Sequence, residues 1–296
     1  MSAEATAAHP VAIGKGRDSE RFFGRLFLFY LLFSLAIGFT MLAALLIKVL
    51  IDGIPSLSWQ LLSAGPSIDP AKAGARPAIL ASLYIGALLI AFTVPIGVGT
   101  AVYLEEYARK DRWYNRFLEL NIQNLAGVPS IVYGILGLAF LVRGLGLGRV
   151  LLAGALILTL LVLPTVIVAS REAIRAVPDS IRQGAFALGA TKWQVVWKQV
   201  LPASIPGIAT GSILALSRAI GETAPLLLVG AVAFVSFNPT LLGSFTALPI
   251  QIFQWIARPQ DEFKALAAAA IIVLLVMLLG LNAVAIWMRN RYQQRW

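Results

Sequence analysis

Cysteine is absent from the 296-residue chain, histidine occurs once, and charged residues make up only 13% of it. Without cysteine there can be no disulfide, thiolate metal site or thiol nucleophile. The single histidine, His9, lies in a polar N-terminal stretch, which excludes a histidine-based proton relay inside a membrane. So few charges also exclude a disordered chain, because disorder requires high charge and low hydrophobicity.

Hydrophobic residues make up 59% of the chain, against about 45–50% in an average soluble protein. This leaves too little polar surface to cover water-soluble cores. Six stretches reach the length of about 20 mostly apolar residues that a helix needs to cross a bilayer. They are Leu26–Leu50, Ala78–Leu104, Leu120–Val142, Val150–Ser170, Ile205–Val235 and Ala265–Met288. The sequence predicts an all-α polytopic membrane protein with six transmembrane helices.

The basic residues predict the orientation of these helices. Six spans place both termini on one side, and that side carries sixteen Lys and Arg residues against seven on the other. Because cytoplasmic loops are enriched in Lys and Arg, both termini are expected in the cytoplasm. Lys and Arg residues in cytoplasmic loops explain the net charge of +10. The expected partner is therefore the bilayer, and nucleic acid is not expected.

The predicted organisation follows from these spans. It comprises a cytoplasmic N-terminal tail (1–25), a first transmembrane helix (26–50), a periplasmic loop (51–77), a domain of five further spans (78–288) with a long cytoplasmic loop (171–204), and a cytoplasmic C-terminal tail (289–296).

Four of the spans contain an interior proline: Pro95, Pro129, Pro164 and Pro225. Proline removes a backbone donor and bends a helix, and membrane helices tolerate it where neighbours or water satisfy the freed carbonyls. Four bent helices favour a transporter or channel over a purely structural bundle. The segment 127–130 is expected to interrupt the third span.

The long cytoplasmic loop predicts two short helices. Pro178 can begin the first, and Gly189 can end it in a left-handed conformation. Ile181, Ala185 and Leu188 recur with helical spacing and predict one apolar face.

Thr191 and Gln194 form a capping box for the second helix, and Pro202 is expected to separate that helix from the fifth span. Its predicted apolar face consists of Trp193, Val196, Trp197 and Val200.

Three interpretations of this loop compete. A DNA-binding helix-turn-helix is disfavoured because the unit lies between two spans and has no long polar recognition helix. The pair could be a connector whose tryptophans lie among lipid headgroups. It could instead dock into a cytoplasmic partner, and the small residues Gly184 and Ala185 would allow a close approach.

The loop resembles the EAA loop of ABC-importer permeases. The resemblance lies in segment 183–189 and in Leu201-Pro202, although the family has Glu and Ala where this chain has Gln183 and Gly184. It implies that the loop carries a coupling helix that enters a cleft of a separate ATP-hydrolysing subunit. The coupling residues would be Gly184, Ala185, Leu188, Gly189, Leu201 and Pro202.

Arg218 and Glu222 lie four residues apart within the fifth apolar stretch, and we expect them on one helix face. An arginine at the centre of a membrane helix costs about 2.5–3.5 kcal/mol, so the presence of a charged pair there needs a structural or functional explanation. It is either an internal salt bridge or a pair lining an anion path, where arginine can bind two oxygens at once. Thr223, Ser217 and Thr210 could add neutral donors.

Segments 215–227, 245–253 and 257–260 resemble the A-type permeases of bacterial phosphate-specific importers, which are type I ABC-importer permeases. The resemblance extends over about residues 78–296 and implies the type I permease fold in the bacterial inner membrane. It also implies a translocation path for inorganic phosphate through Arg218, Glu222, Thr223 and Ser217. The implied partners are a C-type permease, two ATP-binding subunits and a periplasmic phosphate-binding protein.

No Walker A pattern is present in the sequence, so ATP and Mg²⁺ are expected on the partner ATPase, with no catalytic site, metal or cofactor on this chain. A permease for another oxyanion, a passive anion channel and a membrane enzyme remain alternatives. Glu105 and Glu106 are expected either at a solvated helix end or in contact with the ATPase.

Overall fold

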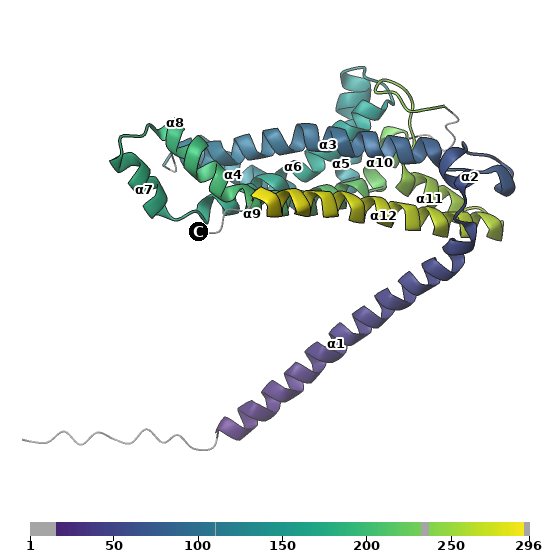
Figure 1. Cartoon of the computed structure of the whole chain (residues 1–296), viewed down its shortest axis with the longest axis horizontal. Coiled ribbons are helices and arrows are strands. Elements are labelled where there is room, and N and C mark those ends of the chain that lie inside the picture. Colours follow the sequence, from purple (N-terminus) through teal and green to yellow (C-terminus); the bar gives the residue numbers. More distant parts are fainter. Residues whose placement is uncertain (1–15, 110, 232–236, 293–296) are drawn as a thin grey trace, which may run out of the picture. The chain divides into compact units, whose positions relative to one another are not determined.

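The computed structural model describes residues 16–109, 111–231 and 237–292, and the described part is helical with no β-strand (Figure 1). It separates into two units, one ending at Val49 and the other beginning at Leu50. Most of the predicted N-terminal tail, including His9, and the end of the C-terminal tail lie outside the described residues.

The first unit consists of helix α1, which runs over Gly16–Gly53 and continues into the second unit. The predicted span began at Leu26, so the helix begins ten residues earlier than expected, within the stretch assigned to a non-helical tail. From Phe22 to Leu50 its side chains are exposed except for Ala43 and Val49. These side chains are mostly apolar, and the helix is long and apolar enough to cross a membrane.

The second unit contains the remaining elements. The long helices are α3 (Arg76–Val102), α4 (Trp113–Ala126), α6 (Leu151–Arg175), α9 (Leu201–Ile220) and α12 (Asp261–Tyr292). The short α-helices are α2 (Trp59–Ser63), α5 (Ser130–Gly137), α7 (Asp179–Ala187), α8 (Lys192–Val195), α10 (Ala224–Val229) and α11 (Leu248–Ile256). The unit also contains two 3₁₀ turns, η1 (Ile54–Ser56) and η2 (Pro70–Lys72). Its three π-helical segments are η3 (Tyr103–Tyr107), η4 (Leu138–Gly144) and η5 (Val196–Val200).

The helices account for the six predicted membrane spans. Five described helices are long and apolar enough to cross a membrane, and the number is six if α4 and α5–η4, which meet at a bend of 108°, together make one span. The bend lies at the predicted interruption, where Pro129 is the residue before α5. The buried Tyr133 bridges the bend, since its hydroxyl donates to the Leu125 carbonyl at 2.9 Å.

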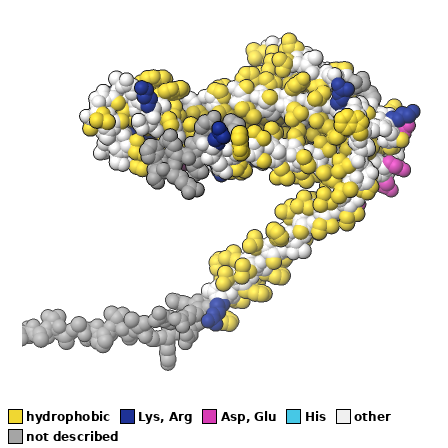
Figure 2. All heavy atoms as spheres, viewed as in Figure 1, with side chains coloured by type: hydrophobic (Ala, Val, Ile, Leu, Met, Phe, Trp, Pro, Cys, Tyr) yellow, Lys and Arg dark blue, Asp and Glu magenta, His cyan; other side chains and the backbone are white. Residues whose placement is uncertain are grey.

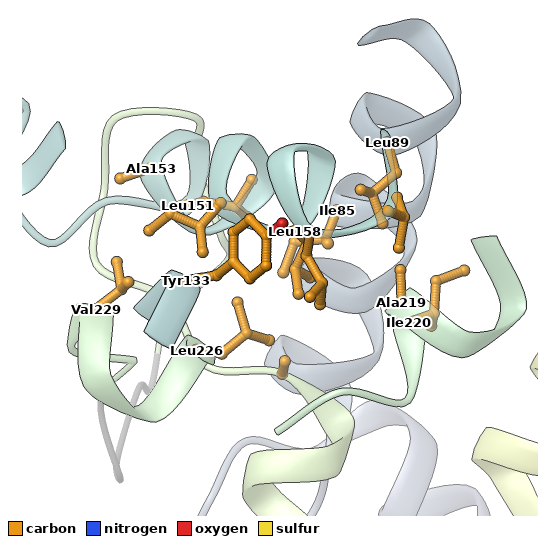
Figure 3. Packing of buried hydrophobic residues seen from close by; sticks show 14 of the residues in the cluster. Ile85, Leu89, Tyr133, Leu151, Ala153, Leu158, Ala219, Ile220, Leu226 and Val229 are labelled. Atoms are coloured by element: carbon orange, nitrogen blue, oxygen red, sulfur yellow. The ribbon is translucent and has the colours of Figure 1, made fainter. Parts of the chain in front are cut away.

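Helix α6 lies at the centre of the packing, against both α3 and α9. Small residues permit these contacts: a Cβ on Gly97 would meet Val166, and one on Gly211 would meet Ala169. Membrane helices pack closely through such small residues. Figure 3 shows Tyr133 of α5, Leu158 of α6 and Leu226 of α10 meeting in this core.

Much of the face of the second unit in Figure 2 is covered by hydrophobic side chains. The predicted loop over residues 51–77 contains η1, α2 and η2, and Leu61 is fully buried within it. The loop packs on α3 and α12, so this segment forms a small ordered layer at one end of the helices.

Candidate functional site

The charged pair in the fifth span lies where a helix ends. Arg218 is in the last turn of α9, which stops at Ile220, and Gly221, Glu222 and Thr223 form a break before α10. Arg218 Nε lies 3.5 Å from Glu222 Oε1. The expectation of one continuous helix face was therefore wrong, although the pairing itself is present. Gly221 ends the helix because its N–H bonds to the Arg218 carbonyl at 3.2 Å instead of continuing the α-helical pattern.

The two charged side chains differ in exposure. The Arg218 side chain is 71% exposed and that of Glu222 is 20% exposed. Leu214, one turn before Arg218, is also exposed, so this side of α9 lies on the surface of the chain. A cation at the C-terminal end of a helix is favoured by the helix dipole. The guanidinium is thus positioned by the end of α9 and remains open to a further ligand.

Two of the three predicted neutral donors, Ser217 and Thr210, interact with α12. The Ser217 hydroxyl lies 2.5 Å from Asn282 Oδ1 of α12, and Thr210 accepts a hydrogen bond from Arg289 at 3.0 Å. Ser217 also lines an apolar cavity of about 490 Å³ between α3, α9 and α12, whose lining does not include Arg218 or Glu222. Ser217 therefore links two helices and does not share a surface with the charged pair. Thr223 lies in the break beside Glu222 and is partly buried.

The half-helix α10 packs on α5 at close range. A Cβ on Gly134 would lie 2.8 Å from the Cα of Pro225, so only glycine leaves room for this contact. Helix α10 then ends at Gly230, which has a left-handed φ of 99°. The break at residues 221–223 is thus followed by a short helix that is fixed against another broken span.

The cytoplasmic loop forms the two predicted helices. Pro178 precedes α7, Gly189 has φ 79°, and Thr191 with Gln194 forms the capping box at α8. The expected separation at Pro202 was wrong, because α8, η5 and α9 run on as one helix from residue 192. The π-helical turn η5 directly precedes Leu201 and Pro202, and such a turn changes the hydrogen-bond register at the point where proline lacks a donor.

The surface of the loop differs from the predicted apolar faces. Ile181 and Ala185 pack toward a core cluster, whereas Leu188 is 90% exposed at the tip. On the second helix, Val196 and Val200 are buried, but Trp193 and Trp197 are exposed and stack on each other at 5.4 Å.

The tip of the loop is open. An added Cβ at Gly184 or Gly189 would meet no atom within 4 Å. A hollow of about 280 Å³ lies between the two helices, lined by Ala185, Leu188, Gly189 and Gln194 among others. Leu201 and Pro202 belong to the helix behind it and do not form the tip. The first four predicted coupling residues thus lie together, and the last two support them.

An ion-pair network at the same end of the molecule was not foreseen. Glu105 and Glu106, expected at a solvated or partner-facing helix end, have side chains only 7% and 11% exposed. Glu105 pairs with Arg171 and Arg175, and Glu106 pairs with Arg182. The sequence shows that these residues carry opposite charges. It does not show which helices meet there, so the pairing could not be predicted.

The comparisons with known proteins bear on both sites. The family described as binding-protein-dependent transport system inner membrane component matches residues 93–296. The chain belongs to this family. Members of this family are membrane subunits of transport systems. This chain is therefore a multi-pass inner-membrane permease.

Named relatives of this inner-membrane component include transport permeases. The probable ABC transporter permease protein YqgI of Bacillus subtilis is 32% identical over 266 residues, covering 86% of this chain and 90% of the relative. The phosphate transport system permease protein PstA of Haemophilus influenzae is 34% identical over 257 residues, covering 84% and 88%. PstA 1 of Mycobacterium tuberculosis is 33% identical over 217 residues, covering 73% and 70%.

Solved structures confirm the fold of this inner-membrane component. A bacterial alginate ABC transporter, solved with an alginate-bound periplasmic protein, matches with a TM-score of 0.64 and 17% identity, over 92% of this chain and 96% of that one. The inward-facing MetNI methionine transporter matches with a TM-score of 0.57 and 18% identity, over 72% and 92%. The predicted type I ABC-importer permease fold is confirmed.

Proposed function

We propose that this chain is one permease subunit of an ATP-driven importer of inorganic phosphate, with Arg218 on the translocation path. The relatives described as phosphate transport permeases support the substrate class. The observation that carries the proposal is the exposed Arg218 side chain at the broken end of α9. An arginine side chain that faces hydrocarbon is costly, so this side of α9 faces water or another subunit.

The pair suits an anion that must bind and leave. Guanidinium donates two parallel hydrogen bonds to neighbouring phosphate oxygens. The single contact to Glu222 at 3.5 Å is long for a charge-assisted hydrogen bond. Glu222 can therefore hold Arg218 in an empty path and give way to phosphate. Competition of this kind keeps binding weak enough for release, which transport requires.

The break at residues 221–223 fits the same role. Backbone without regular hydrogen bonds is tolerated at membrane depth only inside protein or beside water. Transporters place their substrate sites at such interrupted helices. Thr223 is the hydroxyl side chain within this break, whereas Ser217 contacts Asn282 of α12.

The proposed complex contains a C-type permease as the second half of the path, two ATP-binding subunits and a periplasmic phosphate-binding protein. The exposed tip around Gly184, Leu188 and Gly189 would dock into an ATP-binding subunit, which would hold ATP and Mg²⁺. Both termini and the 171–204 loop would lie in the cytoplasm, and residues 51–77 in the periplasm. Closure of the ATPase dimer would rock the permease halves as rigid bodies.

The test is uptake of radiolabelled phosphate by proteoliposomes containing the complete complex. Arg218→Gln should abolish uptake while the complex still co-purifies at normal yield. Arg143→Gln, which changes an exposed arginine outside the site, is the matched control and should transport normally. Normal uptake by Arg218→Gln would overturn the site assignment.

The same vesicles separate the alternative functions. Phosphate import should require ATP and should resist an excess of unlabelled sulfate or nitrate. Uptake without ATP would indicate a passive anion channel, and inhibition by another oxyanion would indicate a different substrate. Either result would overturn the proposed function.

A further inference from the structure

The coupling loop is attached to the membrane helices by a compact network of ion pairs. Arg182, on α7, donates to Glu106 of η3 from Nη2 at 2.9 Å and from Nε at 3.2 Å. The same guanidinium donates to the backbone carbonyls of Val177 at 2.6 Å and Ile174 at 3.0 Å. One side chain therefore connects α7 to the end of α6 and to the end of the span that begins with α3.

The adjacent carboxylate makes a second connection. Glu105 accepts from Arg171 Nε at 2.8 Å and from Arg175 Nη2 at 2.7 Å. Arg171 also donates to Glu119 of α4 at 2.7 Å, and its side chain is only 9% exposed. Three spans, beginning with α3, α4 and α6, thus meet at one buried arginine.

The two consecutive glutamates of the π-helical turn η3 contact arginines on different helices. Glu105 pairs with Arg171 of α6, and Glu106 pairs with Arg182 of α7. Neighbouring side chains of a helix point in different directions, so this one turn can join both helices. Single π-helical turns within α-helices are frequent at functional sites.

Helix α7 has little else to hold it. None of its residues is fully buried, and only Ile181 and Ala185 among them pack against the neighbouring core cluster. Apolar contacts of this size would allow α7 to slide along its neighbours. A guanidinium that makes several hydrogen bonds fixes both the orientation of α7 and its distance from them. Shielding from water also protects such pairs from screening by salt.

We infer that Glu106 and Arg182 are positioning residues that make the coupling helix move as one body with the three spans joined by Glu105, Arg171 and Glu119. The inference rests on the proposed function in one respect, that an ATPase subunit pushes on α7. A displacement at the tip then reaches α3, α4 and α6 together instead of being absorbed by a flexible loop.

The first test measures the number of ATP molecules hydrolysed per phosphate imported by the reconstituted complex. Glu106→Gln keeps the shape of the side chain and removes its charge, so the complex should assemble and hydrolyse ATP but import several-fold less phosphate per ATP. Arg182→Met should do the same, and the double variant should be no worse than the stronger single one. Asp111→Asn, which removes the exposed partner of Arg109 in the neighbouring loop, is the matched control.

A purely structural role would lower the yield of complex and leave the ratio of ATP to phosphate unchanged in the complexes that form. That outcome, or a ratio equal to wild type in both single variants at normal yield, would overturn the inference.

The second test does not depend on the substrate. Because the chain has no cysteine, spin labels can be attached to Ser180→Cys on α7 and Arg116→Cys on α4, in a complex whose partners carry no cysteine. One narrow distance distribution should persist with and without ATP, and Glu106→Gln should broaden it. A distance that changes with ATP in the otherwise wild-type chain would overturn the inference even if the transported anion is not phosphate.

Discussion

The contact between Arg218 and Glu222 is weak by the standards of ion pairs. One side chain is largely exposed, and a single contact of 3.5 Å joins them. Exposed pairs contribute about 0.2–1 kcal/mol, whereas removal of one partner from a buried pair costs about 3–5 kcal/mol because the other charge is left buried and unpaired. The buried pairs at Glu105 and Glu106 serve the opposite purpose, because they hold helices together. Two classes of arginine in one chain are therefore distinguished by their surroundings.

Replacement of Glu222 tests this weak pair directly. Glu222→Gln frees Arg218, so phosphate should bind more tightly and leave more slowly. The change in affinity should stay within about fivefold, because about 1 kcal/mol corresponds to that factor. The measurement is the KM and the maximal rate of phosphate uptake, both of which should fall.

Glu262→Gln is the control, since Glu262 is an exposed carboxylate in the first turn of α12. It should leave both constants unchanged. A higher KM in Glu222→Gln would mean that the carboxylate helps to bind the anion and does not compete with it.

At the scale of elements, the turn between α7 and α8 depends on one backbone conformation. Gly189 has φ 79°, and an added Cβ would meet no atom within 4 Å. Any substitution there acts through the backbone, and left-handed geometry costs an ordinary residue about 1–2 kcal/mol. Asparagine tolerates this region better than a β-branched residue does.

Gly189→Val should therefore uncouple ATP hydrolysis from phosphate uptake, and Gly189→Asn should lose much less coupling. The rate of ATP hydrolysis and the rate of uptake, measured on the same proteoliposomes, give the ratio for each variant. Equal losses of coupling in the two variants would show that side-chain bulk against the ATPase, and not the backbone conformation of the turn, decides the outcome.

Local rules predicted these elements well because their signals lie close together in the sequence. Pro178, Gly189 and the Thr191–Gln194 box act within a few residues and were found where expected. The six apolar stretches likewise follow from composition alone.

The errors share a different cause, since each depends on contacts between distant segments or on a change of helix type. At Pro202 a separation was expected, but the π-helical turn η5 lets the helix run on. After Ile220 a continuous span was expected, but the helix breaks. The burial of Glu105 depends on Arg171, which lies 66 residues away. The turn of Ser217 toward Asn282 depends on the packing of α12 on α9.

At the scale of the whole molecule, many apolar side chains remain uncovered within the chain. In α1 the exposed residues include Phe27, Leu35 and Phe39, and in α12 they include Val276 and Leu279. Soluble monomers rarely expose such surfaces, and these helices are long and apolar enough to cross a membrane. The excess of basic residues on the side of the 171–204 loop predicts that this side faces the cytoplasm.

This orientation can be measured with single cysteines, because the chain has none of its own. Ile68→Cys changes an 82% exposed side chain in the segment expected in the periplasm, and Asp111→Cys changes a 65% exposed side chain between α3 and α4. A membrane-impermeant maleimide applied to intact spheroplasts should label Ile68→Cys alone, and Asp111→Cys should react only after lysis. The reverse pattern would place the coupling loop outside the cell, where no ATP-hydrolysing subunit could reach it, and would contradict the charge argument and the docking proposal together.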